Sequence, residues 1–117
     1  MVARSVRILT LSLLAAAALG LRPAAANPYP TPVVADYVFG CMAVNGQSQE
    51  ALRRCSCSID VIASILPYER YEQAETILRM RQMPGGERMG MFRDTAWARE
   101  AVADLRDAQV EAEVRCF

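Results

Sequence analysis

Apolar residues recur every three or four positions through two consecutive segments of the chain, which is the spacing of amphipathic helices. The first segment ends at the helix breaker Asn45-Gly46, and its apolar positions are Val33, Val34, Tyr37, Val38, Cys41 and Met42. The second segment follows Ser48, a favourable N-cap residue, and ends near Pro67. Its apolar stripe consists of Leu52, Cys55, Ile59, Ile62, Ala63 and Leu66.

Two further helices follow. The third is predicted from about Pro67, because proline favours a first helical turn, to about Gln82, just before Pro84-Gly85-Gly86. Its inward residues are predicted to be Tyr71, Ala74, Ile77 and Leu78. The last helix is predicted from about Ala96 to Arg115, with Asp94 or Thr95 as its cap.

The last helix carries the clearest apolar face, made largely of small residues that let another helix approach closely. This face consists of Ala98, Ala101, Val102, Leu105, Ala108, Ala112 and Cys116. No alternation with a period of two extends over a useful length after the N-terminal segment. The sequence therefore predicts an all-α fold, a small disulfide-stapled bundle of about four helices.

The N-terminal segment has the pattern of a secretory signal peptide. A basic start precedes the apolar run Ile8 to Leu21, and small residues follow up to Ala26. This run is shorter than the ~20 residues that a membrane span requires. We therefore expect residues 1–26 to be removed and residues 27–117 to form a single helical domain, without a membrane anchor, in the bacterial periplasm.

Charge and composition exclude several classes of function. Signal removal takes away Arg4, Arg7 and Arg22, which leaves ten basic against 13 acidic side chains and a net charge near −3. This balance argues against a nucleic-acid partner. The chain has no histidine, so Cys-His and Ser-His catalytic pairs and Cys/His zinc sites are absent. Phosphate-binding loops and nucleophile elbows are absent too, and we do not expect an enzyme.

The four cysteines, Cys41, Cys55, Cys57 and Cys116, suggest two disulfides in a small exported domain. Residues i and i+2 of a helix point about 200° apart, which disfavours a bond between Cys55 and Cys57. Two pairings remain, and we favour Cys41 with Cys55 and Cys57 with Cys116, because the first joins consecutive inward stripes. The alternative is a redox-active or copper-binding Cys55/Cys57 pair.

Carboxylates form two candidate metal sites. On the last helix, four acids fall within about 60° of arc opposite the apolar face, namely Glu100, Asp104, Asp107 and Glu111. Hard cations prefer such oxygen ligands, and three of the four side chains could converge on one ion. The second choice lies on the third helix and consists of Glu69, Glu72 and Glu75. A solvated helix face is the alternative interpretation of both sets.

Five segments together resemble a known family. The segments "YVFGCMAVNG", "CSCSID", "YERYEQAET", "FRDTAW" and "RCF" are similar to landiscernin-like proteins, small exported four-cysteine helical proteins. These proteins are encoded near lanthanide-uptake and pyrroloquinoline-quinone (PQQ) alcohol dehydrogenase genes of methanol-using bacteria. The resemblance covers residues 37–117. It implies lanthanide binding at an exposed carboxylate site with few protein ligands.

An ion with few protein ligands could be shared between two copies of the chain, or be passed to a periplasmic carrier such as lanmodulin or to a PQQ alcohol dehydrogenase. The first hypothesis is therefore a periplasmic lanthanide-binding or trafficking protein that serves methylotrophy and can form metal-centred dimers. The second is a metal-independent helical interaction module for a periplasmic PQQ dehydrogenase or cytochrome. The third is a thiol-disulfide protein that uses Cys55 and Cys57.

Overall fold

The computed structural model describes residues 26–84, 90 and 94–117. These residues contain four α-helices and no β-strand: α2 (Thr31–Asn45), α3 (Gln49–Ile65), α4 (Tyr68–Gln82) and α6 (Ala96–Cys116). The all-α prediction is confirmed, and the helices begin and end close to the predicted positions. Apart from Ala26, the predicted signal peptide lies outside the described residues. No helix in the described part of the chain is long and apolar enough to cross a membrane.

Side-chain caps and special residues set the helix ends. The Ser48 hydroxyl accepts a hydrogen bond from the Ala51 amide at 3.0 Å, and Thr95 accepts one from Ala98 at 3.1 Å. Each cap satisfies an amide that has no partner within its own helix. Gly46 follows α2 with a φ of 102°, a conformation that L side chains rarely adopt. The N-caps at Ser48 and Thr95 agree with the sequence analysis.

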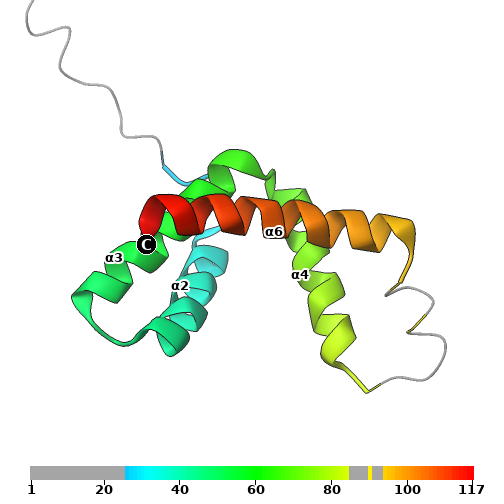
Figure 1. Cartoon of the computed structure of the whole chain (residues 1–117), viewed down its shortest axis with the longest axis horizontal. Coiled ribbons are helices and arrows are strands. Elements are labelled where there is room, and N and C mark those ends of the chain that lie inside the picture. The colour runs from blue at the N-terminus through cyan, green and yellow to red at the C-terminus, as the bar shows by residue number, and fades with distance from the viewer. Residues whose placement is uncertain (1–25, 85–89, 91–93) are drawn as a thin grey trace, which may run out of the picture.

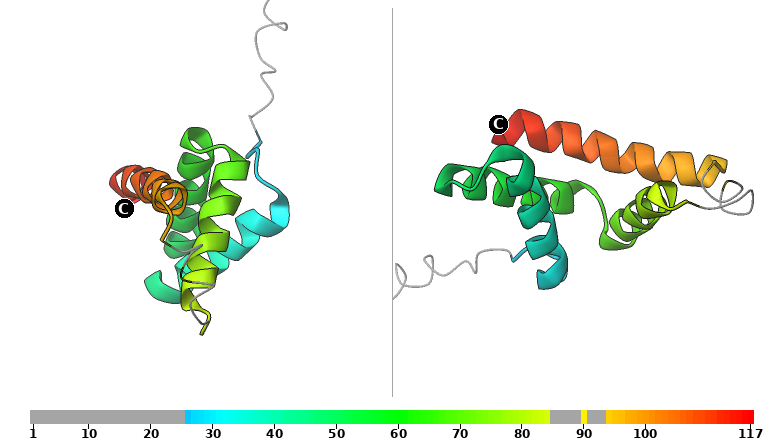
Figure 2. Two further views of the ribbon diagram at one scale, coloured as in Figure 1. Left: turned by 90° about the vertical axis from the view of Figure 1, so that its right-hand side faces the viewer. Right: turned by 90° about the horizontal axis from the view of Figure 1, so that it is seen from below.

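The core lies where α6 crosses α3 and α4 (Figure 1). Small residues line the buried side of α6 and allow close packing, and they include Ala98, Ala101, Ala108 and Ala112. The largest fully buried side chains are Ile59, Ile62, Ile77, Leu105 and Cys55. In contrast, α2 packs chiefly on α3, and Figure 2 shows it standing crosswise to that helix.

Two disulfides fix the helices to one another. Cys41 of α2 is bonded to Cys55, and Cys57 is bonded to Cys116 at the end of α6. The favoured pairing is therefore confirmed. Cys55 lies on the buried side of α3 and is bonded to the preceding helix, whereas Cys57 points to a different helix, α6. All four cysteines are bonded. A thiol-exchange role for Cys55 and Cys57 would require one of these bridges to open first.

One detail of the predicted core is wrong. Leu52, assigned to the inward stripe, is 37% exposed, because it points about 100° away from Ala51, the residue of the same turn that is buried. The predicted apolar side of α2 does face the core, since Val33, Val34, Tyr37 and Val38 are partly buried and pack against it, although no residue of α2 is fully buried. The reason is that α2 and α4 diverge on the same side of α6, so one side of α2 has no neighbouring helix (Figure 1).

The segment before α2 is anchored at the corner between α3 and α4. The Tyr29 hydroxyl donates to the Leu66 carbonyl at 2.6 Å, and its ring packs against Tyr68 and Tyr71 at centroid distances of 5.4 and 4.9 Å. Burial raises the pKa of Tyr29 to about 12. The Asn27 side chain donates to an Asp60 carboxylate oxygen at 2.6 Å. These contacts hold the start of α2 opposite the first turns of α4.

Candidate functional site

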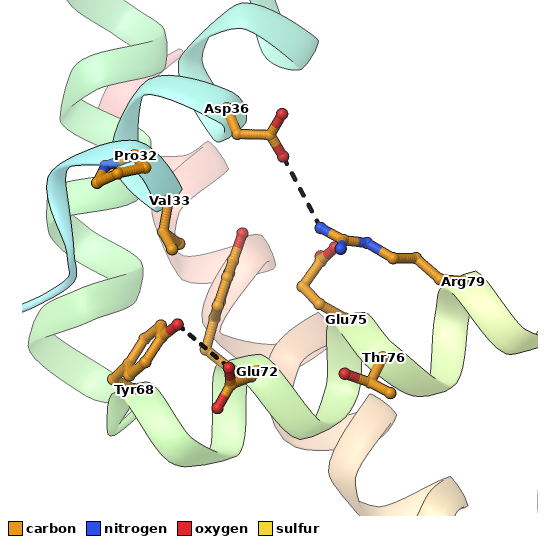
Figure 3. Close-up of a pocket in the computed structure, with 9 residues that line it drawn as sticks. Pro32, Val33, Asp36, Tyr68, Glu72, Glu75, Thr76 and Arg79 are labelled. Atoms are coloured by element: carbon orange, nitrogen blue, oxygen red, sulfur yellow. Dashed lines mark hydrogen bonds and ion pairs between the residues drawn. The ribbon is translucent and has the colours of Figure 1, made fainter.

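The divergence of α2 and α4 creates an open cleft of about 470 Å³ (Figure 3). Its polar side chains come from both helices. Asp36 is contributed by α2, whereas Glu72, Glu75 and Arg79 are contributed by α4. Figure 3 shows Glu75 and Arg79 projecting from α4 toward Asp36. The cleft is therefore the place where acidic groups of two helices meet.

The sequence of α4 explains its charged face. Tyr68, Glu72, Glu75 and Arg79 follow the i, i+4, i+7, i+11 spacing, which places them within about 60° of arc. Tyr71 and Ala74, on the adjoining side, are buried in the core. Because α4 must direct that side inward, its charged face is fixed toward α2. The cleft side chains are thus oriented by the packing of the adjoining side of α4, where Ala74 is buried in the core and Tyr71 also borders the cleft.

Charge in the cleft is incompletely balanced. The Arg79 guanidinium lies 3.9 Å from an Asp36 carboxylate oxygen, and these two side chains are 70% and 79% exposed. An exposed ion pair at this distance stabilises the fold little. Glu75 is half-buried, and burial raises the pKa of its carboxyl group. Arg79 opposes this shift, whereas the negative charge of Asp36 adds to it. The carboxylates of Asp36 and Glu75 thus lie near a single positive side chain, Arg79, which is only weakly held by its long ion pair.

Tyrosines add neutral oxygen atoms to the cleft. The Tyr68 hydroxyl donates a hydrogen bond to a Glu72 carboxylate oxygen at 3.4 Å. Tyr71 also lines the cleft, and its pKa is raised by burial and by the negative charge of Glu75. Its phenol is therefore protonated at neutral pH. Among the described residues that line it, the cleft offers carboxylate and phenolic oxygens, which are hard donors, and no sulfur or imidazole ligand.

The first-choice acidic stripe on α6 has a different environment. Asp104 forms an ion pair with Arg70 of α4 at 2.5 Å, and Glu111 pairs with Arg115 at 2.7 Å. Asp104 and Asp107 line a separate hollow together with Arg70. Arginine therefore already neutralises part of this stripe. Within the ranges that the structure describes, no three Cys, Asp or Glu side chains are grouped closely enough to hold a metal ion as they stand.

The three residues of the second-choice metal site, Glu69, Glu72 and Glu75, do not all lie in the cleft. Glu72 and Glu75 line the cleft, whereas Glu69 is exposed and does not. Asp36, the acid that faces them from α2, was not among the predicted metal ligands. The available signal was a single carboxylate within an otherwise apolar helix. Its position opposite Glu75 depends on the angle between α2 and α4, which periodicity does not specify.

Searches against protein-family models, curated proteins and solved structures gave no match.

Proposed function

We propose that this protein is an exported accessory protein that binds a hard, oxygen-preferring cation, a lanthanide(III) ion, in the α2–α4 cleft. The observation that carries the proposal is the approach of Asp36 and Glu75 from two helices, with Glu72 beside them and Arg79 as their counter-ion. A trivalent cation would relieve the unfavourable burial of the Glu75 charge. Trivalent and divalent hard ions favour carboxylate ligands of this kind.

Ion binding requires the cleft side chains to rotate. Asp36 and Arg79 are largely exposed and their ion pair is long, so little energy opposes their separation. Three carboxylates from the chain would fill only part of a coordination sphere of 6–8 oxygens, the range typical of a large hard cation such as Ca²⁺. The remaining positions would be occupied by water, by a second copy of the chain or by another carrier. This is the property expected of a trafficking protein.

The compartment and partners belong to the same proposal. Two disulfides fit an oxidising compartment, and the resemblance of the N-terminal pattern to a signal peptide supports export to the periplasm. There the ion would be handed to a lanthanide carrier or to a PQQ alcohol dehydrogenase, without catalysis by this protein. Metal-centred dimers would arise when two clefts share one ion.

Titration of the oxidised protein with La(III), Nd(III) and Ca(II), followed by light scattering, tests this function. We expect tighter binding of the trivalent ions, because Coulomb attraction to the carboxylates grows with ionic charge. A mass increase at about one ion per two chains would support the shared site. Absence of binding at micromolar La(III) would reject the metal-binding function.

A further inference from the structure

The solvent-facing side of α2 is apolar to a degree unusual for a surface helix. Phe39 is 77% exposed and Val44 is 86% exposed. Around them lie Ala35 and Ala43, which are also exposed. The opposite side of α2 packs against the core through Val33, Val34, Tyr37 and Val38. The exposed apolar residues therefore form a strip, interrupted by the exposed Asp36, that the packing of the chain does not use. Such a strip marks an interaction surface.

Gly40 lies in the middle of this strip. A glycine in a helix interior is less favourable than alanine. The fold does not require it: its φ is not positive, and nothing lies within 4 Å of the position that a Cβ atom would occupy. Contacts within the chain therefore do not explain the missing side chain. An approaching partner would explain it, because glycine lets a second backbone come close to α2.

A hollow adjoins Gly40 on the side toward α4. It has a volume of about 430 Å³ and includes Gly40 and Val44 of α2. It shares Asp36, Tyr71 and Glu75 with the cleft described above. Because they share these three residues, the two hollows adjoin and form one groove between α2 and α4. A groove between two helices is the usual seat of a third, amphipathic helix.

The charge of the groove selects the chemistry of its occupant. Among the described residues that line the two hollows, Asp36, Glu72 and Glu75 are acidic and Arg79 is the one basic residue. In addition, α2 has no basic side chain in its last turn. Neutral amide groups of Asn45 and Gln47 donate to its last carbonyls, so no positive charge offsets the negative end of the helix dipole there. A second copy of the chain would bring the same negative groups to this surface. A cationic partner is favoured instead.

We propose that the groove along α2 binds an amphipathic helix of a partner protein. The partner's apolar face packs on Gly40 and Val44 in the groove and extends onto Phe39, which lies outside the two hollows. A lysine or arginine at its edge pairs with Asp36 and Glu75. The apolar part of this docking surface does not depend on the metal-binding function, whereas a bound cation would compete with the partner's basic residue for Asp36 and Glu75.

Fluorescence anisotropy tests the proposal with two labelled model peptides in the presence of EDTA. Both peptides form amphipathic helices with the same leucine and alanine face, one edged with lysine and the other with glutamate. We expect the lysine-edged peptide to bind at least about tenfold more tightly, because its charge complements the groove. The chelator makes this result independent of the cation proposal.

Two variants locate the binding surface. Gly40→Leu fills the open space with a better helix former, so it should weaken peptide binding at least about tenfold without lowering the thermal midpoint of unfolding. Ala103→Leu, at an exposed position of α6, is the matched control and should leave the affinity unchanged. An equal loss in both variants would contradict a site on α2.

Three other results would overturn the proposal. Equal affinity for the two peptides would show that the groove does not select a cationic partner. Lack of binding of either peptide at about 100 μM, an affinity too weak for helix docking, would show that it is not a helix site. A doubled mass without peptide that reverts to the single-chain mass in Gly40→Leu would make a second copy of the chain the occupant.

Discussion

At the scale of single residues, Glu75 is the most informative side chain. Its carboxyl group is half-buried beside Asp36, and Tyr71 and Tyr37 lie close enough to feel its charge. Burial raises the folded-state pKa of Glu75 above the ordinary value of 4.5, and Arg79 offsets only part of that shift. The folded state therefore binds a proton more readily than the unfolded state. As the pH rises from the unfolded-state pKa of Glu75 to its folded-state pKa, ionisation of this group lowers the free energy of unfolding.

We predict that Glu75→Gln raises the thermal midpoint of unfolding at pH 7. The substitution removes a charge whose burial is unfavourable. The advantage should disappear below about pH 4.5, where the carboxyl group of the wild-type protein is protonated in both folded and unfolded states. Circular dichroism melts across this pH range provide the measurement. A midpoint below that of the wild-type protein at pH 7 would show that the charge stabilises the fold.

The two described glycines of the α2 region give a matched pair of substitutions. Gly40→Ala should increase the free energy of unfolding by about 0.5–1 kcal/mol, because the site is helical and open. Gly46→Ala should decrease it by a similar amount or more, because the φ of 102° is strained for alanine. Urea denaturation measures both effects. Destabilisation by Gly40→Ala would mean that the glycine is required by the fold itself.

At the scale of elements, α2 depends on its disulfide more than the other helices do. It buries no residue, and the bond from Cys41 to Cys55 ties it to α3 across a separation of 14 residues. Removing this bridge with Cys41→Ser and Cys55→Ala should cost about 3 kcal/mol in the loop-entropy description. Hydrogen exchange should then accelerate mainly in α2, while α3 and α6 remain protected.

Removal of the other bridge serves as the comparison. The bond from Cys57 to Cys116 spans 59 residues, so its loss should cost more, about 4 kcal/mol, and should affect α3 and α6 together. If the first pair of substitutions instead lowered protection throughout the molecule, α2 would be part of the cooperative core. The weak packing of α2 inferred from its exposure would then be contradicted.

The contact between α4 and α6 includes a partly buried ion pair. Arg70 and Asp104 are 29% and 40% exposed, and Arg70 also reaches Gln73. After allowance for solvent screening, a double-mutant cycle with Arg70→Gln and Asp104→Asn should give a coupling energy of about 0.5–1 kcal/mol. A coupling near zero would show that the pair is only a surface contact. Asp104 would then be available as a metal ligand.

At the scale of the whole molecule, features that depend on local sequence could be predicted, whereas the relative positions of the helices could not. The N-caps at Ser48 and Thr95 and the small-residue face of α6 could be recognised from residue type and spacing. Helix geometry disfavoured a bond between Cys55 and Cys57 and left two pairings, and the inward position of Cys41 and Cys55 favoured the one that the structure shows. These features depend on a few neighbouring residues or on one periodic face.

The exposure of α2 and the cleft could not be predicted in the same way. Periodicity identifies an apolar face, but it does not specify which helices reach that face. Asp36 and Glu75 are far apart in the sequence, and they meet only because α4 diverges from α2 at one particular angle (Figure 3). The stripe from Glu100 to Glu111 was visible in the sequence, whereas its pairing with Arg70 depends on packing between α4 and α6.

The most direct test of the cation proposal compares the two acidic surfaces by terbium(III) luminescence titration. Asp36→Asn with Glu75→Gln should weaken binding at least about tenfold, because two ligand charges are removed. Asp104→Asn with Asp107→Asn, the matched pair on α6, should leave the affinity nearly unchanged. The opposite result, with binding lost only in the α6 pair, would contradict a metal site in the α2–α4 cleft and would place the ion on the α6 stripe.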